Sequence, residues 1–456
     1  MQLRVSMAVT ACKAVRRLIR RLGGGATDFP GKVAQKLCPD ILGHLAEDVI
    51  TIIVTGTNGK TTTSRMIEQI LIDNGLSYFS NKSGANLMNG IVAEFCEHAH
   101  ASGRKTCDYA LIECDEAAFK TVSRYVDASY VLVTNVFRDQ LDRYGEITHT
   151  LDNIRIGLKN SPHAVVCLNA DCSLTASLRE DIDNKIILYG VNEPIYKERV
   201  KEASDAPYCI KCKHEYTYEY ITFGHLGKYY CEACGYARPD PDVAVSHVLT
   251  SDATHSEIDI TVEDKTFRAD IELPGGYNIY NGVSAVTMAY AMGLDPGHAV
   301  SSLSTFECGF GRMEKFQLGQ AETRMILIKN PAGCNQVLNF LANIRERSVF
   351  VICLNDNYAD GTDISWIWDV DFEMLRRIED SLAKIYVSGV RADDMAVRLK
   401  YAGFPEEKMA VIKDYDALID AFTSQQDPVF IMPTYTAMMD LRAIVSKKFG
   451  YKNFWE

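Results

Sequence analysis

Hydrophobic residues follow a strand–helix alternation through most of this chain. The segment "DVITIIVTG" (48–56) is a short β-branched apolar run that ends in glycine, a pattern typical of a buried strand. In residues 61–74 the apolar positions recur at helical spacing, and Gly75 follows as a helix stop signal. The pattern therefore predicts a strand, a glycine-containing turn and a helix in direct succession.

Further strands are predicted at "YALIEC", "ASYVLVTNV" and "HAVVCLN", with helix-length segments between them, which favours a parallel sheet covered by helices. The alternating segment "EIDITV" predicts a hairpin strand. From about residue 316 a second strand–helix alternation begins, with strands at "RMILIKN", "SVFVICLND", "AKIYVSG", "KMAVI" and "PVFIMPTY". We therefore expect an α/β protein with an N-terminal segment (1–45), a central domain (46–315) interrupted by an insertion (205–240), and a C-terminal Rossmann-like domain (316–456).

Composition narrows the class of partner. The 456 residues are 47% apolar and 24% charged, as in ordinary globular proteins, and the formal net charge is −12. Because phosphate backbones favour a basic surface, this acidity argues against nucleic acid as the main partner.

The N-terminal segment is an exception to this acidity. Residues 1–37 hold one acidic residue, Asp28, and eight basic residues: Arg4, Lys13, Arg16, Arg17, Arg20, Arg21, Lys32 and Lys36. The stretch "AVRRLIRRL" predicts an amphipathic basic helix, which either packs on the domain with its charges in water or touches anionic lipid. No run approaches the roughly 20 apolar residues of a membrane span. We expect a cytoplasmic protein, with peripheral contact at the inner face of the plasma membrane as the alternative.

Four of the 14 cysteines share a recognisable spacing. Cys209, Cys212, Cys231 and Cys234 form C-x2-C-x18-C-x2-C, the spacing of the two knuckles of a zinc ribbon. Four thiolates would complete a tetrahedral site with no open position, so the predicted zinc is structural. A chance spacing and two disulfides are the alternatives. The remaining cysteines stand mostly in apolar runs, as buried thiols in a reducing compartment do.

The turn after the first strand, "TGTNGKT", predicts a phosphate-binding loop. It departs from the common G-x-x-x-x-G-K-[ST] pattern, because Val54 stands where the first glycine is expected. Glycines let the backbone approach phosphate oxygens, the helix N-terminus favours the anion, and the lysine and threonine suit phosphate and magnesium respectively. The alternative is a chance glycine–lysine turn. The residues expected to bind nucleotide are Gly56, Thr57, Asn58, Gly59, Lys60, Thr61 and Thr62.

Two more strand ends carry polar side chains. Glu113 closes "YALIE" at the edge where ligands of such sheets bind, so we expect it to ligate Mg²⁺ together with Thr61. The alternative is an acidic helix N-terminus made by Asp115 and Glu116. The segment "TNVFRDQLDRYGE" brings further polar groups to the same edge: Asn135, Arg138, Asp139 and Asp142.

These motifs together with "LNADC", "YNIYNGVSAV" and "GRMEKF" resemble, in this order, the Mur ligase family, which includes folylpolyglutamate synthetases. The resemblance runs from about residue 48 to the end. It implies an ATPase domain that activates a carboxylate as an acyl phosphate, with Asn278 and Asn281 near adenine and ribose and Arg312 near the phosphates. The chain departs from the family at Gln140, where members usually carry histidine, and a second magnesium ligand is not assigned.

The zinc ribbon and the C-terminal segments "LNDNYADGTDISWIWDVDFE" and "PTYTAMMDLR" are similar to the MurT-type branch of that family. This resemblance implies an ATP-dependent amidation of the α-carboxylate of D-glutamate in lipid II, a step of peptidoglycan synthesis, with Lys60 and Glu113 in catalysis. Ammonia would come from a GatD-type glutamine amidotransferase subunit. No convincing cysteine–histidine pair for glutamine hydrolysis occurs here, which agrees with a separate subunit.

The resemblance further implies that Asp360 reaches the partner and orients its histidine, although Asp356 and Asp363 stand nearby. The alternative for this acidic loop is a solvated segment that caps the helix of Trp366 and Trp368. Two other functions stay open at this point. One is a ligase that adds an amino acid without a glutaminase, and the other is an ATP-gated regulator that binds RNA or protein through the zinc ribbon.

Overall fold

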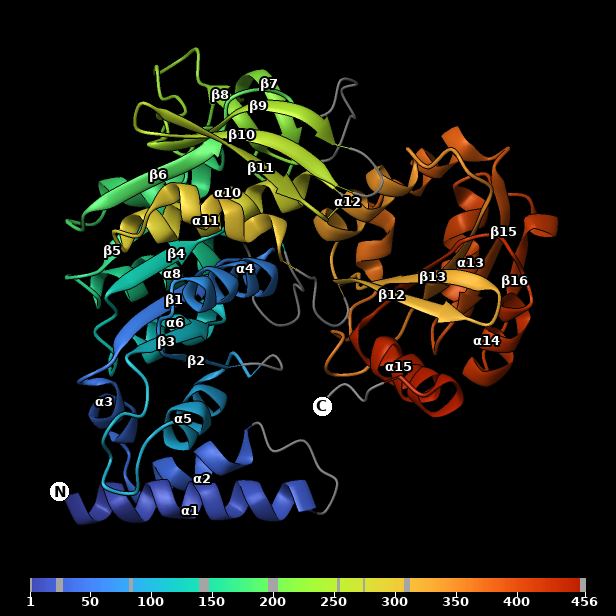
Figure 1. The fold of residues 1–456 in the computed structure, drawn as a ribbon. Helices are drawn as coiled ribbons and strands as arrows, with labels where there is room; N and C mark the ends of the chain where they lie inside the picture. The colour runs from blue at the N-terminus through green and yellow to red at the C-terminus, as the bar shows by residue number, and fades with distance from the viewer. Residues whose placement is uncertain are drawn as a thin grey trace.

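A computed structural model describes residues 2–21, 28–81, 85–138, 147–195, 204–251, 255–273, 275–306 and 312–451. The described residues form two lobes, a central lobe (2–306) and a C-terminal lobe (312–451), which lie side by side in Figure 1. Each lobe has its own mixed sheet and its own hydrophobic core.

The central sheet has nine described strands in the order β11-β10-β9-β6-β5-β4-β1-β3-β2. Strands β1 to β6 and the β6–β9 pair run parallel, as predicted, whereas β9, β10 and β11 pair antiparallel. The predicted hairpin strand "EIDITV" is β10, and the hairpins after the insertion extend one edge of the parallel sheet, which the sequence did not indicate. The strands are β1 (Ile50–Thr55), β2 (Tyr78–Ser80), β3 (Tyr109–Glu113), β4 (Tyr130–Val133), β5 (Val165–Asn169), β6 (Ile186–Val191), β9 (Val243–Ser251), β10 (Ser256–Val262) and β11 (Lys265–Ile271).

Helices cover both faces of this sheet. Helix α4 packs with α10 and α11, and α6 packs with α8 on the opposite face, as right-handed crossovers require. The predicted helix after the first strand is α4, which begins at the loop lysine. The helices are α4 (Lys60–Asp73), α5 (Met88–Glu97), α6 (Glu116–Val122), α8 (Ile147–Lys159), α9 (Ser173–Ser177), η1 (Leu178–Glu180), α10 (Gly276–Ala291) and α11 (Pro296–Ser304).

The N-terminal basic segment forms helix α1 (Gln2–Arg21), which packs against α2 (Phe29–Leu37) and α5, near α3 (Ile41–Ala46). It lies along one end of the central lobe in Figure 1. Its apolar face joins the central core through Val5, Ala8, Val9 and Cys12. Among the described residues, no helix combines the length and apolarity that a bilayer crossing requires.

The insertion forms a small module on the central lobe. Strands β7 (Thr217–Phe223) and β8 (Leu226–Tyr230) make an antiparallel hairpin outside the main sheet. The module has its own core, in which Tyr216 and Tyr229 pack against Cys209 and Cys231.

The C-terminal sheet has six described strands in the order β12-β13-β17-β14-β15-β16. All neighbours are parallel except β12 and β13, which pair antiparallel at one edge. The elements are β12 (Arg312–Leu318), β13 (Ala321–Ile326), α12 (Pro331–Leu341), β14 (Ser348–Cys353), η2 (Ser365–Asp369), η3 (Phe372–Ile378), β15 (Leu382–Ser388), α13 (Ala392–Tyr401), η4 (Glu406–Lys408), β16 (Met409–Val411), α14 (Tyr415–Thr423), β17 (Val429–Pro433) and α15 (Tyr435–Phe449). Helix α12 stands on the side of this lobe that faces the central lobe (Figure 1).

Candidate functional site

The loop between β1 and α4 needs its two glycines for different reasons. Gly56 and Gly59 have φ angles of +116° and +87°, which side-chain-bearing residues rarely adopt. A Cβ on Gly59 would stand 2.3 Å from Oδ1 of Asn281, so this glycine also makes room for a side chain of α10. The loop backbone is thus free to approach a ligand while α10 supports it.

The segment after β4 holds the loop in place. Thr57 N donates to the carbonyl of Asn135 (2.9 Å), and Asn58 N donates to Oδ1 of Asn135 (3.0 Å). The amide of Asn135 returns a bond to the carbonyl of Asn58 (3.0 Å). Asn135, which was predicted only as a polar group at this edge, therefore shapes the phosphate loop through its backbone and its side chain.

Lys60 begins α4 and is buried. Its Nζ donates to the carbonyls of Gly56 and Thr57, the second at 3.3 Å, and forms an ion pair with Glu116 (3.2 Å). Sequence reasoning assigned Glu116 only to a helix N-terminus and missed this pairing. The lysine is thus held over the loop by groups that a phosphate oxygen could replace.

Glu113 ends β3 and is clamped through its backbone. Nδ2 of Asn81 donates to the carbonyl of Glu113 (2.7 Å), and Glu113 N donates to Oδ1 of Asn81 (2.8 Å). Asn81 had no signal of its own in the sequence. Asp115 caps α6 by accepting from Ala117 N (3.0 Å), so the acidic helix N-terminus of the alternative interpretation is present, and the metal-binding role of Glu113 stays a prediction.

One cavity of about 530 Å³ joins these groups to the C-terminal lobe. Its lining includes Lys60, Thr61, Glu113 and Asn281 from the central lobe and Asp360 from the C-terminal lobe. The two lobes also meet beside it, where Nδ2 of Asn330 lies 3.1 Å from Oδ1 of Asn58. The residue types that the sequence singled out for phosphate, magnesium and partner chemistry therefore surround one space.

The two asparagines of α10 lie at the loop. Nδ2 of Asn281 donates to Oδ1 of Asn278 (3.0 Å), and Oδ1 of Asn281 accepts from the hydroxyl of Thr63 (3.2 Å). Asn278 is buried behind Asn281. Asn281 therefore supports the start of α4 and lines the cavity, and Asn278 holds its amide in orientation.

The four cysteines of the module come together. One ligand atom from each of Cys209, Cys212, Cys231 and Cys234 lies within 4.8 Å of every other, and all four thiols are free of disulfides. The two knuckles repeat one geometry, because Lys213 N donates to the carbonyl of Cys209 and Gly235 N to that of Cys231, both at 2.9 Å. The four-cysteine cluster is thus a site that can hold a metal ion, and two disulfides are absent from it.

The chemistry of this cluster suits a thiophilic metal. Its sulfur–sulfur distances include 3.6 Å (Cys209–Cys234) and 3.4 Å (Cys212–Cys231), close to the edge of about 3.8 Å of a tetrahedron with 2.3 Å zinc–sulfur bonds. Burial raises the pKa of Cys209, but N–H groups of Cys212 and Lys211 outweigh it and lower the pKa to about 7. The thiolate that binds metals is therefore accessible near neutral pH.

The acidic loop after β14 gives its three aspartates different surroundings. Asp356 pairs with Arg391 (3.2 Å), and Asp363 accepts from Ser365 N (2.8 Å) at the first residue of η2, although the N-cap position of this helix is Ile364. Asp360 is buried, and its carboxylate accepts from the backbone N–H (2.7 Å) and the hydroxyl (2.5 Å) of Thr436 at the start of α15. Of these three aspartates, Asp360 is the one that lines the cavity.

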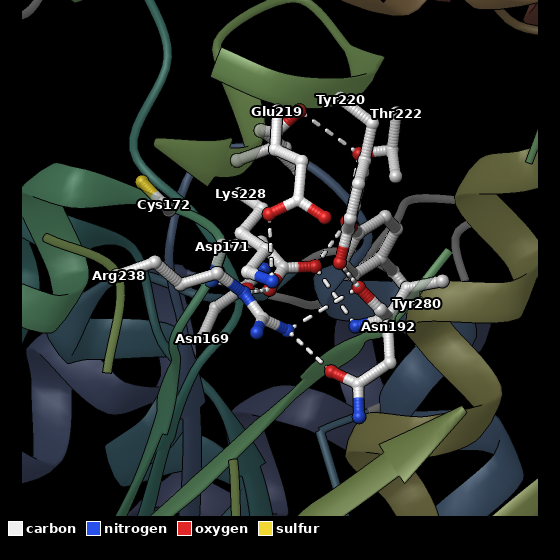
Figure 2. Close-up of polar contacts among 12 residues, drawn as sticks. Asn169, Asp171, Cys172, Asn192, Glu219, Tyr220, Thr222, Lys228, Arg238 and Tyr280 are labelled. Atoms are coloured by element: carbon white, nitrogen blue, oxygen red, sulfur yellow. Dashed lines mark hydrogen bonds and ion pairs between the residues drawn. The ribbon is translucent and has the colours of Figure 1, made fainter. Parts of the chain in front are cut away.

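A buried polar cluster joins the cysteine module to α10. Figure 2 shows the carboxylate of Asp171 between Arg238, which follows the second knuckle, and Tyr280 of α10. Asp171 accepts from Nε of Arg238 (2.6 Å), the hydroxyl of Tyr280 (2.5 Å) and Val191 N (2.9 Å). Burial raises the pKa of Asp171, and Arg238 and Tyr280 oppose this effect.

The cluster also reaches the hairpin of the module, because the Tyr280 hydroxyl lies 2.7 Å from that of Thr222 on β7. Phe223, next along β7, lines the cavity together with Tyr280. The module is therefore part of the cavity's support, a role that its spacing alone did not indicate.

Some predicted site residues lie outside the described residues: Asp139, Gln140 and Asp142. Arg138 is described, and its guanidinium lies 3.9 Å from carboxylates of both Asp205 and Asp369. Arg312 begins β12, and its side chain lies outside the described part of the chain.

Comparison with known families agrees with the motifs. Residues 54–232 match the Mur ligase middle domain, and residues 327–438 match the MurT ligase C-terminal domain. The chain is 33% identical over 450 residues to the lipid II isoglutaminyl synthase (glutamine-hydrolyzing) subunit MurT of Streptococcus pneumoniae, covering 98% of each chain. It is 32% identical to the protein of the same name from Staphylococcus aureus, covering 97% of this chain and 98% of that one.

Solved structures show the same fold at low identity. A pseudomurein peptide ligase type C from Methanothermus fervidus has a TM-score of 0.67 at 22% identity, covering 90% of this chain and 81% of that one. The folylpolyglutamate synthase of Mycobacterium tuberculosis has a TM-score of 0.61 at 13% identity, covering 98% and 96%. The predicted α/β Mur ligase fold is thereby confirmed. The chain belongs to the MurT family of Mur ligases, a family of ATP-dependent ligases.

Proposed function

We propose that this chain uses ATP to activate the α-carboxylate of D-glutamate in lipid II, and that ammonia converts the activated acid into D-isoglutamine. The observation that carries the proposal is that Lys60, Glu113 and Asp360 line one cavity between the lobes. The names of the relatives from S. pneumoniae and S. aureus support the substrate and the product.

In the first step a carboxylate oxygen attacks the γ-phosphorus of ATP, ADP leaves, and an acyl phosphate forms. The loop of Gly56 to Thr62 and the N-terminus of α4 hold the phosphates. Lys60 exchanges its bonds to the loop carbonyls and Glu116 for a phosphate oxygen and offsets the charge that builds up there.

Magnesium fits beside this loop, because Thr61 offers a hydroxyl and Glu113 a clamped carboxylate, and both line the cavity. When bound, the ion supplies positive charge that polarises the phosphoryl oxygens. The residues' own part is to hold the phosphates and the acid in line, and the position of the cavity between the two lobes limits the access of water to the acyl phosphate.

In the second step the nitrogen of ammonia attacks the acyl carbon, phosphate leaves, and a proton is lost from the nitrogen. We propose that a GatD-type glutaminase supplies the ammonia and docks at the acidic loop. This loop is accessible from solvent at the cavity, since Tyr358 and Asp360 both line the cavity and Tyr358 is 83% exposed while Asp360 is buried. Asp360 would orient the partner's histidine, which requires it to exchange its bonds with Thr436.

Exposed aromatic residues support a docking surface on this lobe. Trp368 and Tyr401 are 52% and 75% exposed and contact each other edge to face, with ring centroids 5.5 Å apart. Aromatic side chains are enriched at protein interfaces. Co-purification with the partner tests this: Tyr401→Ser together with Trp368→Ser should weaken complex formation, whereas the exposed Tyr125→Ser on the central lobe should not.

We propose that the four cysteines hold a structural zinc ion, since their free thiols, spacing and sulfur–sulfur distances fit it. Metal content measured by mass spectrometry of the intact protein should give one zinc per chain, lost in Cys231→Ser and retained in Cys107→Ser. A zinc-free chain with four free thiols would contradict this.

We also propose peripheral contact with an anionic membrane surface, where lipid II is held. Apolar residues Leu3 and Leu18 are exposed on α1 beside exposed arginines, including Arg17 and Arg21, which is the composition of an interfacial helix. Arg17→Glu together with Arg21→Glu should reduce co-sedimentation with phosphatidylglycerol vesicles and leave the enzyme's solution activity intact. Equal sedimentation of both proteins would leave the basic face as a solvated surface.

The central experiment incubates the zinc-loaded chain with ATP, Mg²⁺, lipid II and ammonium, and measures the product by mass spectrometry. The product expected is the amide, together with one phosphate released per amide formed. Glu113→Gln and Lys60→Met should each lower the rate by about a hundredfold or more, because they remove charge stabilisation of the transferring phosphoryl group.

Asp360→Asn separates the ligase reaction of this chain from the hydrolysis of glutamine by the partner. It should leave the ammonium-dependent reaction largely intact and abolish the glutamine-dependent reaction with the partner.

If the product forms only when a free amino acid is the nitrogen donor, the chain is an amino-acid-adding ligase. Salt-sensitive RNA binding without phosphate release would instead favour a zinc-ribbon regulator.

A further inference from the structure

A buried carboxylate stands behind the lysine of the phosphate loop. Nζ of Lys60 and Oε2 of Glu116 lie 3.2 Å apart, and the two side chains are 8% and 7% exposed. Lys60 lines the cavity between the lobes, whereas Glu116 does not belong to the described lining. Glu116 is therefore placed to affect a bound ligand through the lysine.

Local structure fixes the position of this carboxylate. Glu116 is the first residue of α6, directly after the capping residue Asp115. Asp115 N donates to the carbonyl of Asn86 (3.0 Å), and Cys114 N donates to that of Val54 on β1 (2.9 Å). The start of α6 is thus held by two neighbouring segments, which keep the backbone of Glu116 beside the loop lysine.

The ion pair occupies the group that a phosphate needs. A lysine ammonium has three donors, and Nζ of Lys60 donates to the carbonyls of Gly56 and Thr57 as well as to Glu116. The carbonyls are uncharged, so the carboxylate is the strongest of these three acceptors. A phosphate oxygen must displace the carboxylate, or share the lysine with it, to bond to the ammonium.

Other carboxylates surround this pair. Glu113, which ends β3, and the capping residue Asp115 are buried within three residues of Glu116. Burial raises the pKa of the Cys114 thiol, and these three carboxylates raise it further. Lys60 opposes the rise, so all four charges surround one thiol. Removal of one of the carboxylates should therefore favour an incoming anion at this lysine.

We propose that Glu116 is the counter-ion that competes with the β- and γ-phosphates of the nucleotide for Lys60, a positioning role that rests on the use of ATP proposed above. In the empty loop Glu116 holds the ammonium and compensates its charge. When the nucleotide binds, the lysine turns to the phosphate, and the carboxylate then lies close to another anion. Glu116 therefore weakens nucleotide binding and favours the release of ADP after each turnover.

The test measures equilibrium binding of nucleotides to the full-length chain with Mg²⁺ by calorimetry. Glu116→Gln keeps the shape of the side chain and removes its charge, so it should bind ADP about tenfold more tightly than wild type, the cost of one charge-assisted hydrogen bond. AMP lacks the phosphates that the loop lysine reaches, so its affinity should stay unchanged. A gain confined to ADP and ATP is not expected from a change in stability alone.

Glu94→Gln is the matched control. Glu94 forms a buried ion pair with Arg16 (2.7 Å) in the same lobe, but between α1 and α5 and outside the described cavity lining. This variant leaves a buried arginine without its carboxylate, as Glu116→Gln does with the lysine, and should bind ADP as wild type does. If it binds ADP more tightly to the same extent, the effect comes from lost stability and the assignment fails.

Lys60→Met decides whether Glu116 acts through the lysine. In that background the competition is absent, so adding Glu116→Gln should change the affinity for ADP by less than about twofold. A tenfold gain that persists without Lys60 would make Glu116 a general source of repulsion and overturn the positioning role. Glu116→Asp keeps a compensating charge in the fold and shortens its reach, so it should give a gain of the same sign and smaller size.

Two other outcomes overturn the inference in different ways. If Glu116→Gln and Glu116→Asp bind ADP as wild type does, or more weakly, the carboxylate does not compete for the lysine, while the proposed function stands. Failure of wild type to bind any nucleotide would overturn the use of ATP and this inference together.

Discussion

Two buried polar groups, one in the lining of the cavity and one bonded to the lining residue Tyr280, differ in how their hydrogen bonds are met. Asp171, in the central lobe, has its carboxylate bonded to Arg238, Tyr280 and Val191. Gln336, in the C-terminal lobe, has neither amide atom bonded within the described residues. Both are almost completely enclosed.

This difference distinguishes buried polar groups that stabilise the fold from buried polar groups that are available to a ligand. A buried group whose bonds are all met inside the chain stabilises one arrangement of its neighbours, here the docking of the cysteine module on α10. A buried group without partners destabilises the empty protein, and the folded chain tolerates it where a ligand supplies the missing bonds. Substitutions at the two positions should therefore change stability in opposite directions.

The largest effect is expected for Asp171→Asn. An asparagine keeps the shape but must either turn an N–H toward Nε of Arg238 or lose the bonds from Tyr280 and Val191 N, and it leaves the arginine's charge uncompensated. Breaking a buried ion pair in this way costs about 3–5 kcal/mol of folding free energy. Hydrogen exchange of the backbone amides of β5 and α10, measured at increasing urea concentration, gives the loss in the free energy of unfolding of the central lobe.

Asp181→Asn is the control for this change. Asp181 pairs with Arg155 at 2.6 Å, but both side chains are partly exposed, so the loss should stay below about 1 kcal/mol. Similar losses at the two positions would mean that the Asp171 cluster does not contribute as a buried network.

A smaller effect is expected for Tyr280→Phe. The substitution removes the bonds of the hydroxyl to Asp171 and Thr222, while Asp171 keeps Arg238 and Thr222 keeps its bond to the Leu226 carbonyl (3.0 Å). We expect a loss of about 1 kcal/mol, measured by the same exchange experiment. The phenylalanine ring still lines the cavity, so nucleotide affinity should change little. A larger loss of affinity than of stability would make this hydroxyl a ligand contact.

The sequence predicted the local geometry of the candidate site well and its tertiary contacts poorly, and the roles of its residues stay predictions. The phosphate loop, Glu113 and the four cysteines could be found because strand, turn and thiol spacing fix their geometry over short stretches. The hydrogen bonds by which Asn135 holds the loop were not predicted, since they depend on β1 and β4 being neighbours in the sheet.

Other residues gave weaker signals. The pair Asn335–Gln336 interrupts an apolar helical stretch, "PAGCNQVLNFL", and a polar pair on a helix that must be buried could have been singled out. Asp171 belonged to a family-like segment, but its partner Arg238 stands 67 residues later, within the insertion. The antiparallel extension of the central sheet was also missed, because the alternation of apolar and polar residues in a hairpin strand does not indicate which sheet the strand joins.

The smallest effect is expected for the stability of Gln336→Met, and its sign decides the comparison. Methionine fills a similar volume without polar atoms, so it removes two unmet hydrogen-bonding groups and should raise the free energy of unfolding of the C-terminal lobe by less than about 1 kcal/mol. All three tryptophans follow residue 316, so tryptophan fluorescence in urea reports this lobe selectively. Gln425→Met, which removes an amide bonded within the lobe, should lower the free energy instead. A stabilised Gln336→Met would mean that this amide is unpaired in the empty protein and free to bond a ligand, whereas a destabilised variant would mean that the amide is bonded in solution and belongs with Asp171.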